Sequence, residues 1–122
     1  MTHILLKRVY EADAPDDGFR VLVDRLWPRG IKKEALKMDL WAKEATPSTA
    51  LRKWFHEDPQ HRWDEFSRLY RQELADSPAA KDLAQTVKRH KVTTLLYAGK
   101  DSEHTHAKVL KAYLEKHLDG EK

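Results

Sequence analysis

Three short apolar runs predict three β-strands. The first covers residues 4–10, the second residues 19–24 and the third residues 92–98. The second run contains Val21, Leu22 and Val23 in succession, without polar alternation. This pattern is typical of a strand that is buried on both faces, as in a covered parallel sheet. The second run is also rich in β-branched and aromatic residues, which favour strands, and the third run is the clearest of the three.

Helical periodicity dominates the long stretch between the second and third strands. Ser48 is expected to cap a helix, because its hydroxyl can accept a hydrogen bond from a free amide of the first turn. Ser77 and Pro78 form a similar start, with proline at the first helical position. The expected helical segments are a short piece around residues 36–43, then 48–58, 61–75, 78–91 and, after the third strand, 102–118.

The order of these elements is strand, strand, several helices, strand, helix. The long helical connection between the second and third strands suits a crossover between parallel strands. We therefore expect residues 1–122 to form a single α/β domain. Its small, mostly parallel sheet should have three or slightly more strands and about four to five flanking helices. The direction of the first strand stays open, because residues 11–18 are too few for a crossover helix.

Composition narrows the chemistry. The 122 residues are 40% hydrophobic and 35% charged, with a net charge of +3 and no cysteine. The lack of cysteine excludes disulfides, zinc–thiolate sites and cysteine nucleophiles. No apolar run approaches the length of a membrane span, so we expect no membrane association and a cytoplasmic location.

The ends of the second and third strands carry the candidate binding residues. Asp24 ends the second strand and is followed by Arg25 and Arg29, whereas Lys100 follows the third strand. Ligands bind beyond the carboxyl ends of strands in open parallel sheets. If the two strands are parallel, these side chains line one anion-binding cleft, with Asp24 as an acid, a base or an arginine-orienting group. The alternative is that Asp24 pairs with an arginine and only locks the loop.

His106 is the second candidate for proton transfer. It lies three, four and seven residues before the apolar Val109, Leu110 and Tyr113, so it should point along the core face of the last helix. A histidine at the cleft end of that helix suits general acid or base catalysis near neutral pH. The alternative is a half-buried histidine that is hydrogen-bonded to backbone.

Neither a metal nor a cofactor is expected. His104 and His106 are two residues apart, and side chains at this spacing diverge on a helix. The chain has no metal-binding H-E-x-x-H motif and no phosphate-binding P-loop.

Two other functions compete with the anion site. The basic loop 25–33, with Trp27 inside it, offers contacts to a nucleic-acid backbone. The helices between residues 48 and 89 give little support for a helix-turn-helix DNA reader, because only one strand follows them and no hairpin wing is present. The third reading is an interaction module in which Trp27 and Pro28 dock a protein partner. The isomer of the Trp27–Pro28 bond stays open.

The chain resembles the YeaO-like family of bacterial proteins, a family defined as a domain of unknown function. The longest matching block is D-R-L-W-P-R-G, residues 24–30, and further matches lie at residues 7–10, 18–23, 46–48, 51–52, 55–56 and 95–98. The resemblance covers nearly the whole chain and implies one α/β domain in a cytoplasmic bacterial protein, without a known reaction. Some members carry labels as MarR-type transcriptional regulators.

Longer members of this family look similar at two points. In them one strand ends with an Asp-x-Arg motif, and the final helix begins with Cys-His-Arg. The first motif maps loosely onto Asp24 and Arg25, and the second onto Thr105, His106 and Ala107. The cysteine and the second arginine are missing here, so a thiol role does not carry over. The strand-end residues, taken together, predict a small anionic or phosphate-bearing ligand at loops 24–30 and 99–106. Whether acid–base catalysis accompanies binding stays open.

Overall fold

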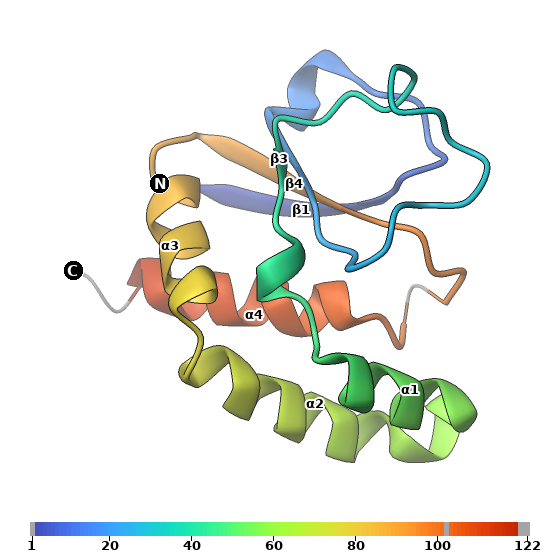
Figure 1. Cartoon of the computed structure of the whole chain (residues 1–122). Coiled ribbons are helices and arrows are strands. Elements are labelled where there is room, and N and C mark those ends of the chain that lie inside the picture. Colours follow the sequence, from blue (N-terminus) through green and yellow to red (C-terminus); the bar gives the residue numbers. More distant parts are fainter. Residues whose placement is uncertain (1, 102, 120–122) are drawn as a thin grey trace.

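The computed structural model describes residues 2–101 and 103–119, and for Asp119 the backbone alone. The strands and helices follow one another along the chain as shown in Figure 1. They are β1 (His3–Arg8), a 3-10 turn (Pro15–Asp17), β2 (Phe19–Leu22), β3 (Leu40–Trp41), a 3-10 turn (Lys43–Ala45), α1 (Thr49–Glu57), α2 (Pro59–Ala75), α3 (Pro78–Val87), β4 (Val92–Tyr97) and α4 (His106–Asp119).

The four strands form one sheet in the order β1-β4-β2-β3, and every neighbouring pair is parallel. Leu95 of β4, for example, pairs with Leu6 on one side and Val21 on the other. The small parallel α/β fold is therefore confirmed, and the first strand runs in the same direction as the others.

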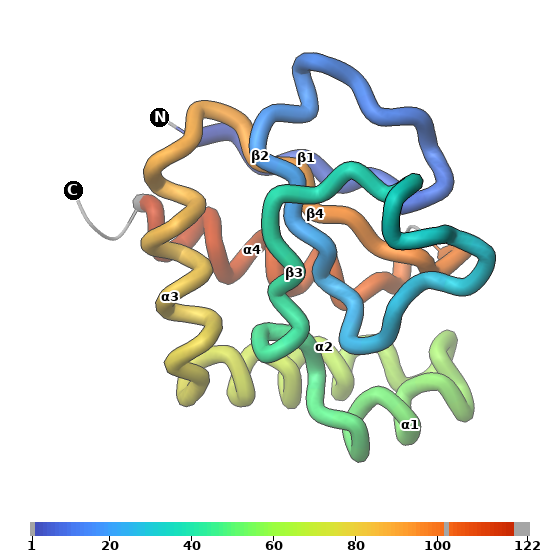
Figure 2. Tube along the Cα trace, turned by 45° about the horizontal axis from the view of Figure 1, so that its top comes forward, coloured from blue at the N-terminus to red at the C-terminus, as the bar shows by residue number. Residues whose placement is uncertain are grey.

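The four helices cover one face of this sheet (Figures 1 and 2). A large core lies between them and includes Val21, Leu95 and Tyr70, each with no exposed surface. The opposite face is covered by the loop that follows β2, and a second, smaller core forms there around Leu22 and Leu96. The central strands β2 and β4 are buried on both faces, which the continuous apolar run of residues 21–23 predicts for β2.

The helix starts follow local capping chemistry. The Ser48 hydroxyl accepts a hydrogen bond from the Leu51 amide and donates one to Glu73 at 2.6 Å. Ser77 accepts from the Ala80 amide and precedes Pro78 at the first helical position. Both predicted caps are confirmed, and Ser48 is thus fully engaged as a helix cap.

The expected helical piece around residues 36–43 is wrong. The chain forms the two-residue strand β3 there, followed by a single 3-10 turn. Tertiary contacts override the local helix preference: the Ala42 amide donates to the Leu22 carbonyl, and the Trp41 indole donates to the Asp24 carbonyl at 2.7 Å. These bonds hold the segment extended along β2.

The last helix begins later than expected, at His106 and not at residue 102, which lies outside the described residues. The carboxylate of Asp101 accepts hydrogen bonds from the amides of Glu103 and His104. This side-chain turn offers the backbone an alternative to helix. The helix starts only after Thr105, whose carbonyl accepts from the Lys108 amide.

A buried charged cluster holds the turn between β1 and β2. Asp17 pairs with Lys7 at 3.1 Å and with Arg20, and it also accepts from the Ala14 amide. Burial raises the pKa of Asp17, but these donors outweigh it and hold that pKa below its ordinary value. The next residue, Gly18, has a φ of +67° and leaves no room for a side chain, because a Cβ would lie 2.3 Å from the Val92 carbonyl oxygen.

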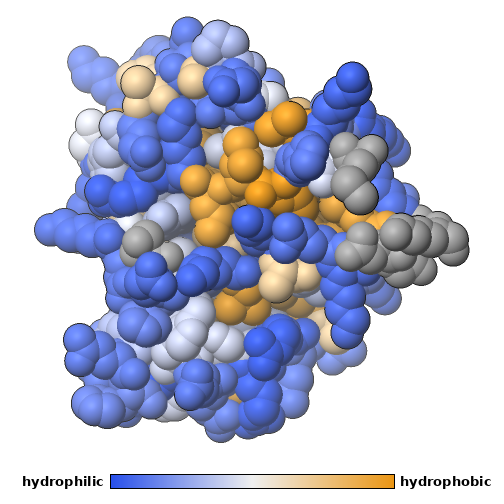
Figure 3. All heavy atoms as spheres, turned by 180° about the vertical axis from the view of Figure 1, so that it is seen from behind, coloured by the Kyte–Doolittle hydropathy of each residue, from blue (hydrophilic) through white to orange (hydrophobic). Residues whose placement is uncertain are grey.

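Strand β1 is an edge of the sheet and lies away from the viewer in Figure 1. Figure 3 shows the molecule from behind, and hydrophobic side chains gather in the middle of this side of the surface. Leu5 of β1 is 45% exposed.

Among the described residues, no helix is long and apolar enough to cross a membrane.

Candidate functional site

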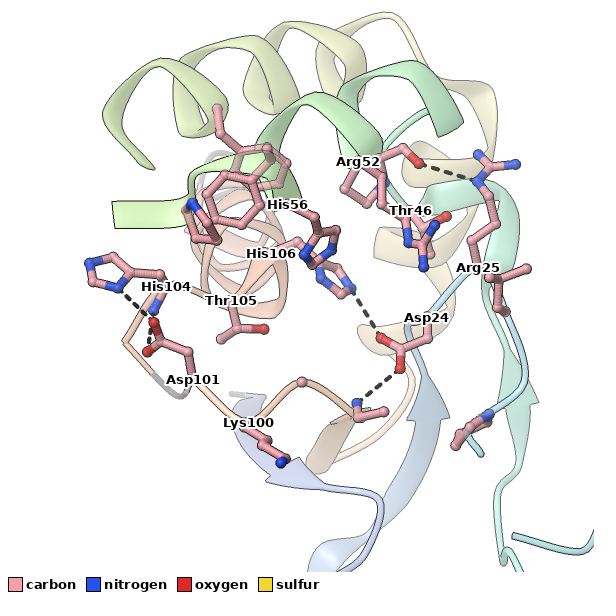
Figure 4. Close-up of a pocket in the computed structure, with 18 of the residues that line it drawn as sticks. Asp24, Arg25, Thr46, Arg52, His56, Lys100, Asp101, His104, Thr105 and His106 are labelled. Carbon is pink, nitrogen blue, oxygen red and sulfur yellow. Dashed lines mark hydrogen bonds and ion pairs between the residues drawn. The ribbon is translucent and has the colours of Figure 1, made fainter. Parts of the chain in front are cut away.

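A pocket of about 590 Å³ opens at the carboxyl ends of β2 and β4 (Figure 4). Parallel α/β proteins bind ligands at this end of the sheet, beyond the carboxyl ends of the strands. Its wall is built from both strand-end loops, from α1 and the first half of α2, and from the start of α4. The lining residues are Tyr10, residues 24–29, Thr46, Pro47, Arg52, Phe55, His56, Pro59, Phe66, residues 98–101 and residues 104–106.

Asp24 and His106 meet at the point where the pairing of β2 and β4 ends. The Val23 amide still donates to the Leu96 carbonyl at 2.9 Å. The next bond of a parallel ladder would run from the Ala98 amide to the Val23 carbonyl. Instead, the Ala98 amide donates to Asp24 Oδ2 at 2.9 Å, and the Val23 carbonyl accepts from His106 Nε2 at 2.6 Å. Two side chains thus replace one ladder bond.

The same two side chains also contact each other. His106 Nε2 lies 3.3 Å from Asp24 Oδ1. Because Nε2 donates to a carbonyl, a neutral His106 ring carries its proton on Nε2 and keeps Nδ1 as an acceptor. The geometry gives both residues a positioning role, since they join the ends of two strands to the first residue of α4. Asp24 forms no ion pair with Arg25 or Arg29 among the described contacts.

The loop that follows Asp24 is held by indole and phenol hydrogen bonds. The Trp27 indole donates to the Ile31 carbonyl at 2.6 Å, and the Tyr10 hydroxyl donates to the Arg29 carbonyl at 3.1 Å. Pro28 is buried, and the peptide bond before it is trans. Trp27 is half-buried with its ring edge-on to Trp41, so its main contacts lie inside the fold.

Two arginines supply positive charge on one side of the pocket. The Arg25 Nε donates to the Pro47 carbonyl at 3.2 Å, which leaves the rest of its guanidinium available. Arg52, from α1, lies beside it (Figure 4). Neither forms an ion pair with a described carboxylate, and both are half-buried. In total, four cationic residues and two carboxylates line the pocket: Arg25, Arg29, Arg52 and Lys100 against Asp24 and Asp101.

His56, one turn after Arg52 on α1, adds a further polar group. Desolvation is the main cause that lowers its pKa, and the charges of Arg52 and His106 lower it further, against the opposing charge of Asp24. A histidine with a lowered pKa is neutral at pH 7 and can donate one hydrogen bond and accept another.

The opposite side of the pocket is formed by the loop after β4. His104 Nδ1 lies 2.8 Å from Asp101 Oδ2, and its ring packs edge-on against Trp63. The His104 side-chain hydrogen bond, followed by the backbone amides of the turn, lowers the pKa of Asp101. Lys100 is exposed and reaches the rim.

All six residues singled out from the sequence line this pocket: Asp24, Arg25, Trp27, Arg29, Lys100 and His106. Arg52 and His56 were missed as site residues. They lie four residues apart on α1, each directly after a core residue, Leu51 or Phe55. That spacing places them on one helical face beside the buried stripe, but only the tertiary fold brings that face to the strand ends. Within the described part of the chain, no group of acidic and histidine side chains is arranged to hold a metal ion.

Comparisons with known proteins identify relatives of this chain. A family model described as the inactive DUF488-N3 subclade matches residues 3–122. The uncharacterised protein YeaO of Escherichia coli K12 is 47% identical over 113 residues, which are 92% of this chain and 96% of YeaO. An uncharacterised protein of Mycobacterium tuberculosis is 44% identical over 109 residues, 89% of this chain and 91% of the relative. No solved structure matches.

The family match spans almost the whole α/β domain, including both loops of the pocket, and the resemblance to YeaO-like proteins is confirmed. The chain therefore belongs to the DUF488 family, within its DUF488-N3 subclade.

Proposed function

We propose that this protein binds a small anionic ligand, such as a phosphate-bearing molecule, in the pocket at the strand ends. The observation that carries the proposal is the pair of half-buried arginines, Arg25 and Arg52, which line the pocket and form no ion pair with a carboxylate among the described residues. Leaving a guanidinium partly desolvated and unpaired is costly unless an anion completes it. Arginine also matches phosphate and carboxylate oxygens in a bidentate geometry.

Binding accounts for the site better than catalysis does. Asp24 and His106 are the natural proton-transfer pair, but each is held by a backbone group at the end of the sheet. A general base must instead reach the proton that it removes. The description of the subclade as inactive agrees with a site that retains binding without a reaction.

The nucleic-acid and protein-docking alternatives have weaker support. Arg25, the first cation of the basic loop, reaches back to the Pro47 carbonyl and lines the pocket. This leaves Arg29, Lys32 and Lys33 as the exposed cations of that loop. Trp27, the proposed docking residue, is fixed internally by its indole hydrogen bond.

An NMR titration with methyl phosphate tests the proposal. Shifted amide signals should cluster at loops 24–30 and 99–106 and at the first two turns of α1. Arg25→Gln and Arg52→Gln should each weaken binding at least about tenfold, the usual value of a charge-assisted hydrogen bond. Arg71→Gln, an exposed arginine of α2 away from the pocket, is the matched control and should leave binding unchanged. Equal binding by all four proteins would refute the proposal.

A further inference from the structure

The pocket is larger and more apolar than an inorganic anion requires. A volume of about 590 Å³ falls in the range of sites for small organic molecules. Its lining includes Phe55, Pro59 and Phe66 besides the charged groups. The ligand should therefore carry an apolar part as well as its anion.

The two arginines and His104 lie on different sides of the pocket. Figure 4 shows Arg25 and Arg52 on one side of the opening and His104 on the other, with His56 and His106 between them. The arginine side is the natural place for the anion. It is separated from His104 by the width of the pocket.

The His104 side continues into a run of aromatic contacts. The distance between ring centroids is 5.3 Å for His104 and Trp63, 5.8 Å for Trp63 and Phe66, and 4.1 Å for the stacked rings of Phe66 and Phe55. Phe55 and Phe66 are almost completely buried, so only a small part of each ring faces the pocket, and that part is a floor fixed by packing. His104 is held as a side wall by Asp101 and Trp63. A flat group is the shape that such rigid ring faces and edges accommodate best.

We propose that the ligand class is an organic anion with a flat, uncharged ring. The anion lies at Arg25 and Arg52, and the ring lies over the aromatic floor against His104. The inference rests on the proposed function, since the arginines anchor the same ligand. It makes His104 a specificity-determining residue: it should affect how tightly the ring binds and not how tightly the anion binds.

Three phosphate monoesters separate the two parts of the proposal by isothermal titration calorimetry: methyl, butyl and phenyl phosphate. We expect phenyl phosphate to bind at least about tenfold more tightly than methyl phosphate, because the pocket removes much of the ring from water. Phenyl phosphate should also bind at least about threefold more tightly than butyl phosphate, which has apolar surface but no flat face. His104→Ala should reduce the preference for phenyl over methyl phosphate.

His61→Ala is the matched control. His61 is also a histidine bound to an aspartate three residues earlier, Asp58, but it lies outside the pocket. Equal binding of methyl and phenyl phosphate would overturn the ring inference and leave the anion site standing. Equal binding of butyl and phenyl phosphate would overturn the requirement for a flat ring. If none of the three esters bound, the proposed function would fall together with this inference.

Discussion

The exchange of one ladder bond for two side-chain bonds makes a quantitative prediction. Asp24→Ala leaves the Ala98 amide without its acceptor, and His106→Ala leaves the Val23 carbonyl without its donor. The side chains of Asp24 and His106 are only 15% and 23% exposed, so water can restore these bonds only in part. Each substitution should therefore lower the free energy of unfolding by about 1–2 kcal/mol, toward the lower end of the cost of an unpaired polar group.

The double variant should cost less than the sum of the two single variants. With both side chains removed, the Ala98 amide and the Val23 carbonyl are free to form the ordinary ladder bond with each other. We expect the double variant to recover at least about 0.5 kcal/mol relative to additivity, within the range found for contacting residues.

Urea unfolding of the four proteins measures this cycle, and each kcal/mol corresponds to about 4 °C in melting temperature for a domain of this size. Asp64→Ala, at an exposed position of α2 outside the pocket, is the control and should stay within about 0.5 kcal/mol of the wild type. Strictly additive losses, or single variants as stable as the wild type, would show that the two side chains do not substitute for the ladder bond.

Three further predictions follow from other parts of the structure. Desolvation and the charge of Arg52 lower the pKa of His56, so an NMR titration should give a value below about 6.5. This pKa should rise when methyl phosphate binds, because the anion offsets the neighbouring positive charge. An unchanged pKa would place the anion elsewhere. Asp17 has a lowered pKa, so its stabilisation is present above about pH 4 and is lost as the pH falls through the folded-state value. The advantage of the wild type over Asp17→Asn in urea unfolding should shrink between pH 5 and pH 3, and a constant advantage would contradict the assignment. Gly18→Ala should destabilise the protein by more than about 2 kcal/mol, because it adds a backbone clash to a positive φ. Gly30→Ala, with a φ of +77° but open space around it, should cost only about 1–2 kcal/mol, and equal losses in thermal melts would refute the clash.

Much of the fold follows from local patterns. The second strand has a continuous apolar run at residues 21–23, and helices start at residues such as Ser48 that satisfy free amides. Strand β3 could not be predicted in this way. It is two residues long, and what holds it extended is its pairing with β2 and the bond from Trp41 to a carbonyl seventeen residues earlier.

The candidate site was predictable only in part, for a related reason. The strand-end rule brings Asp24 and Lys100 to one edge of the sheet once the strands are parallel. Arg52 and His56 come from α1, and the orientation of this helix depends on how it packs beside α2. The periodicity of α1 predicts the helical face on which Arg52 and His56 lie. It does not predict which other parts of the protein that face contacts. The role of Asp24 also depends on geometry, because its partners are a backbone amide and a histidine rather than the adjacent arginines.

The most direct test of the anion site is a crystal structure of the protein soaked with phenyl phosphate. We expect the phosphate group between Arg25 and Arg52, with the ring over Phe55 and Phe66 and beside His104. A phosphate bound elsewhere on the protein, with the pocket between the strand-end loops empty, would contradict it.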